Sequence, residues 1–211
     1  MTLKKRNTLV LFSSLSDNTN KEKTPLTDDE LVRQILDTNN SALFGKLYDR
    51  YSKKIYNKCY SFAEDADEAQ DLMQDVFLKL FTKLDTYKGR SKFSTWLYSF
   101  TYNFLVNYKK RDAPKKLGER WERLNNKDTH LAQVDDIDEE DLFELKTSNL
   151  EKALGELEPA DKAILLLKYQ DEVPVKDIQK LLNISESAVK MRLKRARIKL
   201  IKAHQKLQRD D

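Results

Sequence analysis

The residues best suited to chemistry are basic side chains near the C-terminus. Between Glu186 and Arg209 the sequence holds nine lysines and arginines and no further acid. Apolar residues in this stretch recur at steps of four, three and four, at Val189, Leu193, Ala196 and Leu200. That spacing predicts a helix with one buried stripe and a basic outer surface. A solvated surface helix is one interpretation, but a short helix and a tight turn before it favour a helix-turn-helix that binds DNA.

A second basic segment, residues 87–116, is interleaved with aromatic side chains. Its cations are Lys88, Arg90, Lys92, Lys109, Lys110, Arg111, Lys115 and Lys116, and its aromatic residues include Tyr87, Phe93, Trp96, Tyr98, Tyr102 and Tyr108. Cations neutralise phosphates while rings stack on unpaired bases, so this composition favours single-stranded DNA. Trp96, Phe100 and Phe104 have the spacing of core residues and are expected to pack inside, which leaves Tyr87 as the better stacking candidate.

An enzymatic interpretation rests on three carboxylates. Asp67, Asp71 and Asp75 are spaced by four and would share one helix face, where they could hold the metal ion of a nuclease. However, acids in a first helical turn usually complement the helix dipole, and no histidine completes such a site. We therefore expect no enzyme activity and no cofactor, and a nuclease assay with magnesium would test this.

The elements that must position these residues are expected to be helices throughout. The chain has 211 residues, 39% of them hydrophobic, with only 4 Gly and 4 Pro, too few for a turn-rich β fold. We predict an all-α protein. A polar tail at 1–28 precedes a helical bundle at 29–112, with helices at 43–62, 65–84 and 96–111. A flexible acidic linker at 113–148 leads to a four-helix domain at 149–208, with helices at 150–157, 163–169, 175–182 and 185–207.

Helix boundaries and the cellular compartment can also be predicted. Thr27 and the two aspartates after it are typical of a helix start, Ser185 of the start of the last helix, and Gly89 of a left-handed turn. The single cysteine excludes an internal disulfide, and no apolar run approaches the ~20 residues of a membrane span. The apolar stretch at residues 9–12 is too short for a signal peptide, so a cytoplasmic protein without membrane insertion is expected.

Three segments in series resemble the extracytoplasmic-function sigma factors of bacterial RNA polymerase. They are DEAQDLMQDVFLKLF (67–81), YKGRSKFSTWLYSFTYNFLVNYKKR (87–111) and the helix-turn-helix segment 153–200. The resemblance covers most of residues 29–205 in the family's order. It implies a sigma factor in which 29–112 is region 2, which binds core RNA polymerase and the −10 element, and 149–208 is region 4, which binds the −35 element.

The resemblance also implies roles for individual residues. The polymerase-binding residues would be Asp71, Gln74 and Asp75. The −10 residues would be Tyr87, Arg90, Ser91, Lys92, Phe93, Asn103, Lys109, Lys110 and Arg111, with a flipped base held by the loop above Asn103. The −35 residues would be Ser185, Ser187, Lys190, Met191, Arg192, Lys194, Arg195 and Arg197. Lys190, Met191, Lys194 and Arg195 would contact bases, whereas Arg192 and Arg197 would contact phosphates.

The sequence departs from the family pattern in the helix-turn-helix. Ser187 and Ala188 stand where Gly-Thr is common, so a hydroxyl of Ser185 or Ser187 would have to bind phosphate instead. Met191 replaces a small polar residue. Lys194 stands where aromatic or other residues occur in the family, so the resemblance does not predict which promoter sequence the chain selects. Pro174, between two valines, replaces a polar helix start but fits a first helical turn.

The resemblance implies core RNA polymerase, double-stranded and melted promoter DNA, and an anti-sigma factor as partners. The acidic linker could also fold onto Lys109–Lys116 and mask it. The alternative function is a free-standing helix-turn-helix regulator whose N-terminal bundle binds a ligand or dimerises. That alternative leaves the basic-aromatic segment 87–111 unused, and co-elution with core polymerase would separate the two.

Overall fold

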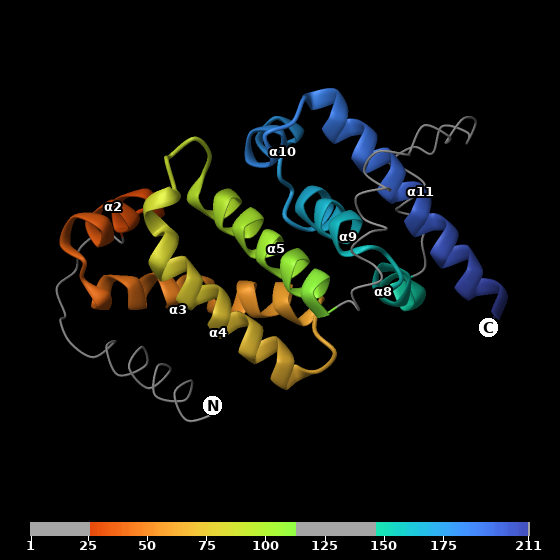
Figure 1. The fold of residues 1–211 in the computed structure, drawn as a ribbon, viewed down its shortest axis with the longest axis horizontal. Coiled ribbons are helices and arrows are strands. Elements are labelled where there is room, and N and C mark those ends of the chain that lie inside the picture. Colours follow the sequence, from red (N-terminus) through yellow and green to blue (C-terminus); the bar gives the residue numbers. More distant parts are fainter. Residues whose placement is uncertain (1–25, 113–146, 211) are drawn as a thin grey trace. The chain divides into compact units, whose positions relative to one another are not determined.

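A computed structural model describes residues 26–112 and 147–210, and every regular element in these two ranges is helical (Figure 1). The all-α prediction is therefore confirmed. The predicted tail and acidic linker lie outside the described residues except at their ends. By packing, the chain divides into two compact units whose boundary falls between Thr101 and Tyr102. Within the described ranges no helix combines the length and the apolar character that crossing a bilayer would require.

The first described helix, α2 (Asp28–Thr38), begins where the sequence predicted. The hydroxyl of Thr27 accepts a hydrogen bond from the Glu30 amide, and the Glu30 carboxylate accepts one from the Thr27 amide at 2.9 Å. This reciprocal pair satisfies two amides that the helix itself leaves without partners. Leu31, Val32 and Ile35 form the buried face of α2, which packs against α3 and η1.

The two following helices are long and pack against each other (Figure 1). Helix α3 (Ser41–Tyr60) is capped by Asn40, and α4 (Ala66–Lys83) by Asp65. Their buried residues match the predicted stripes and include Phe44, Leu47, Ile55, Cys59, Leu72, Val76, Phe77 and Leu80. Burial raises the pKa of the Cys59 thiol to about 12, so the thiol is protonated at neutral pH.

A short η1 turn (Leu84–Thr86) and the loop 87–92 lead into α5 (Phe93–Asp112). This helix starts three residues before the predicted position and ends with Lys109, Lys110 and Arg111, cations that suit the negative end of the helix dipole. Near its start α5 contacts α3, where the buried Lys58 ammonium lies 4.1 Å from the centre of the Tyr98 ring. The start of α5, directly after the loop, is therefore held against α3.

The C-terminal unit contains the four predicted helices. Helix α8 (Thr147–Gly155) is followed by α9 (Pro159–Leu165), which continues into the wider π turn η3 (Leu166–Gln170). Helix α10 (Val175–Leu182) ends at Asn183, whose left-handed φ of 52° turns the chain into α11 (Glu186–Asp210). The expected stripe of α11 is buried, from Val189 at 0% exposed to Leu200 at 4%, and α11 packs on α8, α9 and α10.

Candidate DNA and polymerase interfaces

Helix α11 begins with two exposed hydroxyl side chains. The Ser185 oxygen accepts a hydrogen bond from the Ala188 amide at 3.2 Å, so Ser185 caps the helix as predicted. The Ser185 and Ser187 hydroxyl oxygens also lie 2.9 Å apart. Both side chains are exposed at the positive end of the helix dipole, where a phosphate would be stabilised.

The basic residues of α11 are not equivalent. Near its N-terminus Lys190, Met191 and Arg192 are exposed, with Met191 at 51%, whereas Lys194, Arg195 and Arg197 are half-buried. The Lys190 ammonium lies 2.7 Å from the Glu186 carboxylate, and this hydrogen bond lowers the pKa of Glu186. The Lys190 ammonium has three donors, so this contact leaves two of them for other acceptors.

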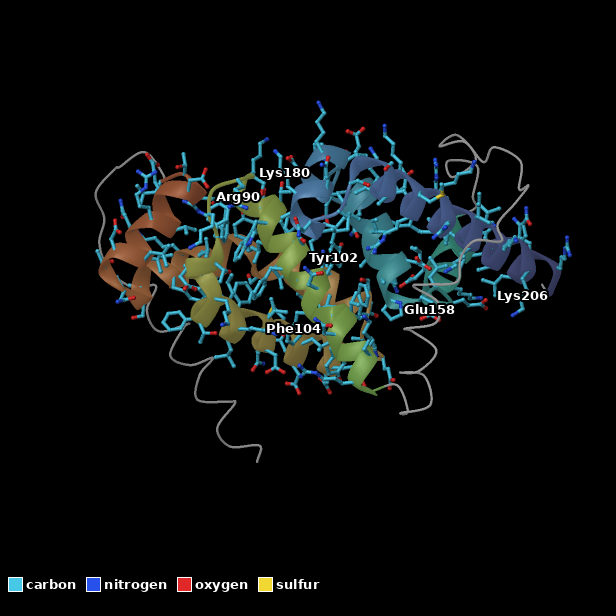
Figure 2. The ribbon with its side chains drawn as sticks, turned by 45° about the horizontal axis from the view of Figure 1, so that its top comes forward. Arg90, Tyr102, Phe104, Glu158, Lys180 and Lys206 are labelled. Carbon is cyan, nitrogen blue, oxygen red and sulfur yellow. The ribbon has the colours of Figure 1, made fainter. Side chains whose placement is uncertain are left out.

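Farther along α11, two cations pair with carboxylates of the same unit. Lys199 lies 2.6 Å from Asp161, and Lys206, labelled in Figure 2, lies 3.9 Å from Glu156. These pairs stabilise the packing of α11 against the helices before it. Lys199 and Lys206 thus pair with other helices of the unit, whereas Lys190 pairs with Glu186 on α11 itself.

Sequence reasoning missed two cations on α10. Lys176 and Lys180 are both exposed and share a face of the first helix of the helix-turn-helix, and Lys180 lies 3.3 Å from Asp177 (Figure 2). In helix-turn-helix proteins this first helix crosses the DNA backbone. Their spacing of four within a predicted helix was the signal that could have identified them.

The loop 87–92 has one fixed residue at each end and exposed cations between. The Tyr87 hydroxyl lies 2.6 Å from an Asp29 oxygen and 2.7 Å from the Ser91 carbonyl oxygen. Burial, followed by the Asp29 hydrogen bond, raises the pKa of Tyr87. Gly89 has the predicted positive φ, 65°. Arg90, labelled in Figure 2, and Lys92 are exposed, whereas Ser91 is half-buried.

The aromatic residues around this loop are buried to different extents. Phe93, one of the expected −10 residues, is 1% exposed, so its ring lies in the core. Trp96, Phe100 and Phe104 are half-buried, and the prediction that they lie in the core is wrong. The buried stripe of α5 is instead Phe93, Leu97, Thr101 and Leu105. Both stripes repeat every four residues, so spacing alone cannot tell which one faces inward.

The half-exposed rings form a row beside the loop. The Tyr87 and Trp96 ring centres are 5.3 Å apart, and Trp96 stacks on Phe100 at 5.4 Å with 29° between the planes. The remaining −10 candidates lie on α5, where Asn103, Lys110 and Arg111 are exposed and Lys109 is half-buried. Ring faces and cations on one helix are what stacking and backbone binding of unpaired DNA require.

Helix α4 has an outer face that is acidic at its start and apolar at its end. Asp71 is exposed, and Gln74 and Asp75 are half-buried. On the same face, one and two turns later, Leu78 is 39% and Phe81 is 47% exposed, which the sequence analysis missed. Both residues fell outside the predicted buried stripe, and that was the available signal. We call Asp71, Gln74, Asp75, Leu78 and Phe81 the α4 face.

The nuclease interpretation depends on a metal site. Among residues 26–112 and 147–210, no three histidine, cysteine, aspartate or glutamate side chains are arranged to hold a metal ion. Asp67, Asp71 and Asp75 lie within the first of these ranges. The described structure gives this interpretation no support.

Comparisons with known proteins agree with this arrangement. The family Sigma-70 region 2 matches residues 47–114, and the family Sigma-70, region 4 matches residues 147–200, so together they cover more than half of the chain. The ECF RNA polymerase sigma factor SigW of Bacillus subtilis (strain 168) is 29% identical over 170 residues, which are 79% of this chain and 90% of SigW.

Solved structures give the same fold. CnrH, solved in complex with the cytosolic domain of CnrY, has a TM-score of 0.54 at 20% identity, over 86% of this chain and 97% of CnrH. At this identity the likeness concerns the fold alone. Helix α2, its capping residue Thr27 and the end of α11 after residue 200 lie outside both family matches.

Proposed function

The chain belongs to the sigma-70 family, as an RNA polymerase sigma factor of the extracytoplasmic-function group, and we propose that its helices divide promoter recognition between them. Sigma factors are DNA-binding initiation factors, so core RNA polymerase and promoter DNA are partners of this chain. In our proposal residues 29–112 act as region 2 and residues 149–208 as region 4. The free-standing regulator is not favoured, because it leaves the region 2 match without a role.

Helix α11 reads the −35 element in this proposal. The supporting observation is that its buried stripe leaves Lys190, Met191 and Arg192 exposed directly after the Ser185 cap. Side chains at the N-terminal end of a recognition helix reach base edges in the major groove. Lys194 and Arg195 join Lys190 and Met191 in contacting bases. Phosphates are contacted by Arg192, Arg197, Ser185, Ser187 and the two α10 lysines.

The loop 87–92 reads the −10 element after the strands separate. A flipped base costs a few kcal/mol of lost stacking, which contacts with the loop must offset. Arg90 and Lys92 bind the backbone, while Ser91 and Asn103 supply polar groups for the base. Tyr87, Trp96 and Phe100 supply ring faces, and the cations at the end of α5 follow the strand onward. The protein itself performs no covalent chemistry, since nucleotide addition belongs to the polymerase.

The α4 face binds core polymerase. Its polar residues are those that the family resemblance identified, and Leu78 and Phe81 extend it with apolar area that water would otherwise cover. We expect Leu78→Asp to weaken core binding about ten- to hundredfold, because it places a charge in a desolvated interface. Leu36→Asp is the matched control, since Leu36 on α2 is 40% exposed and Leu78 is 39% exposed. Equal binding of both variants to core polymerase, measured by fluorescence titration, would contradict this role.

A second proposed partner is an anti-sigma factor, and the proposed compartment is the cytoplasm, where RNA polymerase works. CnrH, which shares this fold, was solved with the cytosolic domain of CnrY bound. An inhibitor of this kind would cover surfaces that the polymerase or DNA needs. Loss of transcription on adding the partner, and its recovery with excess core polymerase, would indicate that the partner competes with core polymerase.

Transcription in vitro tests the whole proposal. Core polymerase with this chain should start RNA at promoters selected by both a −10 and a −35 preference, on a library randomised at both elements. Core polymerase alone is the control. Identical start sites with and without the chain would overturn the proposal.

A further inference from the structure

The −10 loop is tied to a helix far away in the sequence. The Tyr87 hydroxyl lies within hydrogen-bond distance of an Asp29 oxygen, at 2.6 Å, and of the Ser91 carbonyl oxygen, at 2.7 Å. Both partners are acceptors, and the hydroxyl has one hydrogen to donate. The hydroxyl shares this one hydrogen between the Ser91 carbonyl on the far side of the loop and Asp29 at the start of α2.

The Asp29 side of this contact is itself held in place. Directly before it, the Arg50 guanidinium on α3 donates to the Asp28 carboxylate at 2.8 Å and to the Leu26 carbonyl at 2.6 Å. The Tyr51 hydroxyl also donates to Asp28. Two adjacent α3 residues therefore fix the start of α2, so Asp29 offers the loop a stationary acceptor.

The Tyr87 ring has separate support, which makes the hydroxyl an added constraint. The ring packs edge-on against Phe93 at 5.3 Å and lies at the same distance from Trp96. Removing the hydroxyl alone leaves these contacts in place. Gly89 has a positive φ, a Cβ added there would meet no atom within 4 Å, and Arg90 is exposed. The Lys88 ammonium donates to the Asp85 carbonyl oxygen at 2.8 Å, which holds the first part of the loop before this tip.

We propose that Asp29 and the Tyr87 hydroxyl form a latch that sets the shape of the loop 87–92 and thereby sharpens base selection at the −10 element. Asp29 is a positioning residue that does not contact DNA. This inference rests on the proposed −10 role of the loop. Asp29 lies outside residues 47–114, so the region 2 match does not include it.

A preset loop favours specificity because the energetic cost of ordering it is met before DNA binds. A loose loop must be ordered on binding and can adapt to a wrong base, so it loses both affinity and discrimination. The latch involves a single hydrogen bond to α2. Its loss is therefore expected to lower discrimination about two- to tenfold, the range for one net hydrogen bond.

The test uses the full-length protein and four single variants. Tyr87→Phe removes only the hydroxyl, and Asp29→Ala removes the acceptor. Asp29→Asn keeps an acceptor oxygen and is the conservative rescue. Asp37→Ala, at the other end of α2, is the control. Hydrogen exchange of the loop amides is measured in the free protein, and transcription by holoenzyme is compared on promoter pairs that differ at −10 or at −35.

We expect Tyr87→Phe and Asp29→Ala to speed exchange in the loop and to lower −10 discrimination about two- to tenfold, with −35 discrimination unchanged. The double variant should lose no more than Tyr87→Phe alone, because removing the hydroxyl already removes its contact with Asp29. Asp29→Asn should retain most of the discrimination. Unchanged exchange in both variants, or reduced −10 discrimination in Tyr87→Phe but not in Asp29→Ala, would overturn the latch.

A further variant separates this inference from the proposed function. Suppose that Arg90→Ala lowers transcription that depends on the −10 element while the latch variants leave −10 discrimination unchanged. The latch is then overturned, and the proposal that the loop 87–92 reads the −10 element is retained. If Arg90→Ala also has no effect, the proposed reading of −10 by this loop is overturned, and the inference with it. The exchange measurement needs no DNA and therefore reports on the contact in either case.

Discussion

The two regions proposed to bind DNA are positioned in opposite ways. The reading residues of α11 sit on a helix whose cap, buried stripe and ion pair with Glu186 all lie within a few residues of them. The loop 87–92 has no regular structure of its own, and it depends on α2, which lies 58 residues away along the chain. A recognition helix can therefore change its reading residues one at a time, whereas the loop depends on the packing of the whole N-terminal unit.

The largest expected effect distinguishes a buried residue that supports the −10 loop from an exposed residue proposed to contact DNA. Phe93→Ala removes a ring that is 1% exposed beneath the loop and should cost about 3–5 kcal/mol of unfolding free energy along with −10 recognition. Met191→Ala, at a residue 51% exposed on α11, should change stability by about 0.5 kcal/mol or less while altering −35 preference. Urea denaturation and transcription on mutant promoters measure both effects. Similar destabilisation by the two changes would break the comparison.

An intermediate effect distinguishes two roles within α11. Lys190→Ala should relax selectivity at one −35 position by about 1–3 kcal/mol of binding free energy, because a base contact is lost. Arg197→Ala should weaken binding to all sequences and reduce the salt slope by about one, because a phosphate contact is lost. Binding of holoenzyme to −35 variants over a range of salt concentrations measures both. A uniform loss from Lys190→Ala would show that it reads no base.

The smallest effect is in the acid range and compares the starts of two helices. The Thr27 amide hydrogen bond lowers the pKa of Glu30 from its usual 4.5, and the hydrogen bond with Lys190 does the same for Glu186. Because both values are lowered, each pair stabilises the fold fully above about pH 4.5, and this is lost as the pH falls through the lower folded value. Carboxyl NMR titrations should show that Lys190→Ala raises the pKa of Glu186 and leaves that of Glu30 unchanged. If the pKa of Glu30 also shifted, the lowering of the two pKa values would not come from local hydrogen bonds.

Sequence patterns predicted helix α11 well because its determinants are local. The Ser185 cap lies next to the helix start, the buried stripe repeats at helical intervals, and both are confirmed by the structure. The α10 lysines were missed although their spacing was visible. The residue roles taken from the family resemblance remain predictions until the variants are measured.

The N-terminal site was harder to predict because its determinants are distant in sequence. The positive φ of Gly89 was predicted correctly, but nothing local links Tyr87 to Asp29. Trp96 was expected in the core and is half-buried, whereas Phe93, expected at the −10 site, is buried. Two stripes with the same period on α5 are distinguished only by what packs against them, which is tertiary information.

The burial of Cys59 has a practical consequence. Its thiol is 0% exposed, and its raised pKa leaves little of the reactive thiolate at neutral pH. An alkylating reagent should therefore modify the native protein only as fast as the surrounding helices separate. Since the sequence contains a single cysteine, the labelling rate reports how often the N-terminal unit opens. It can be measured without engineering a probe into the chain.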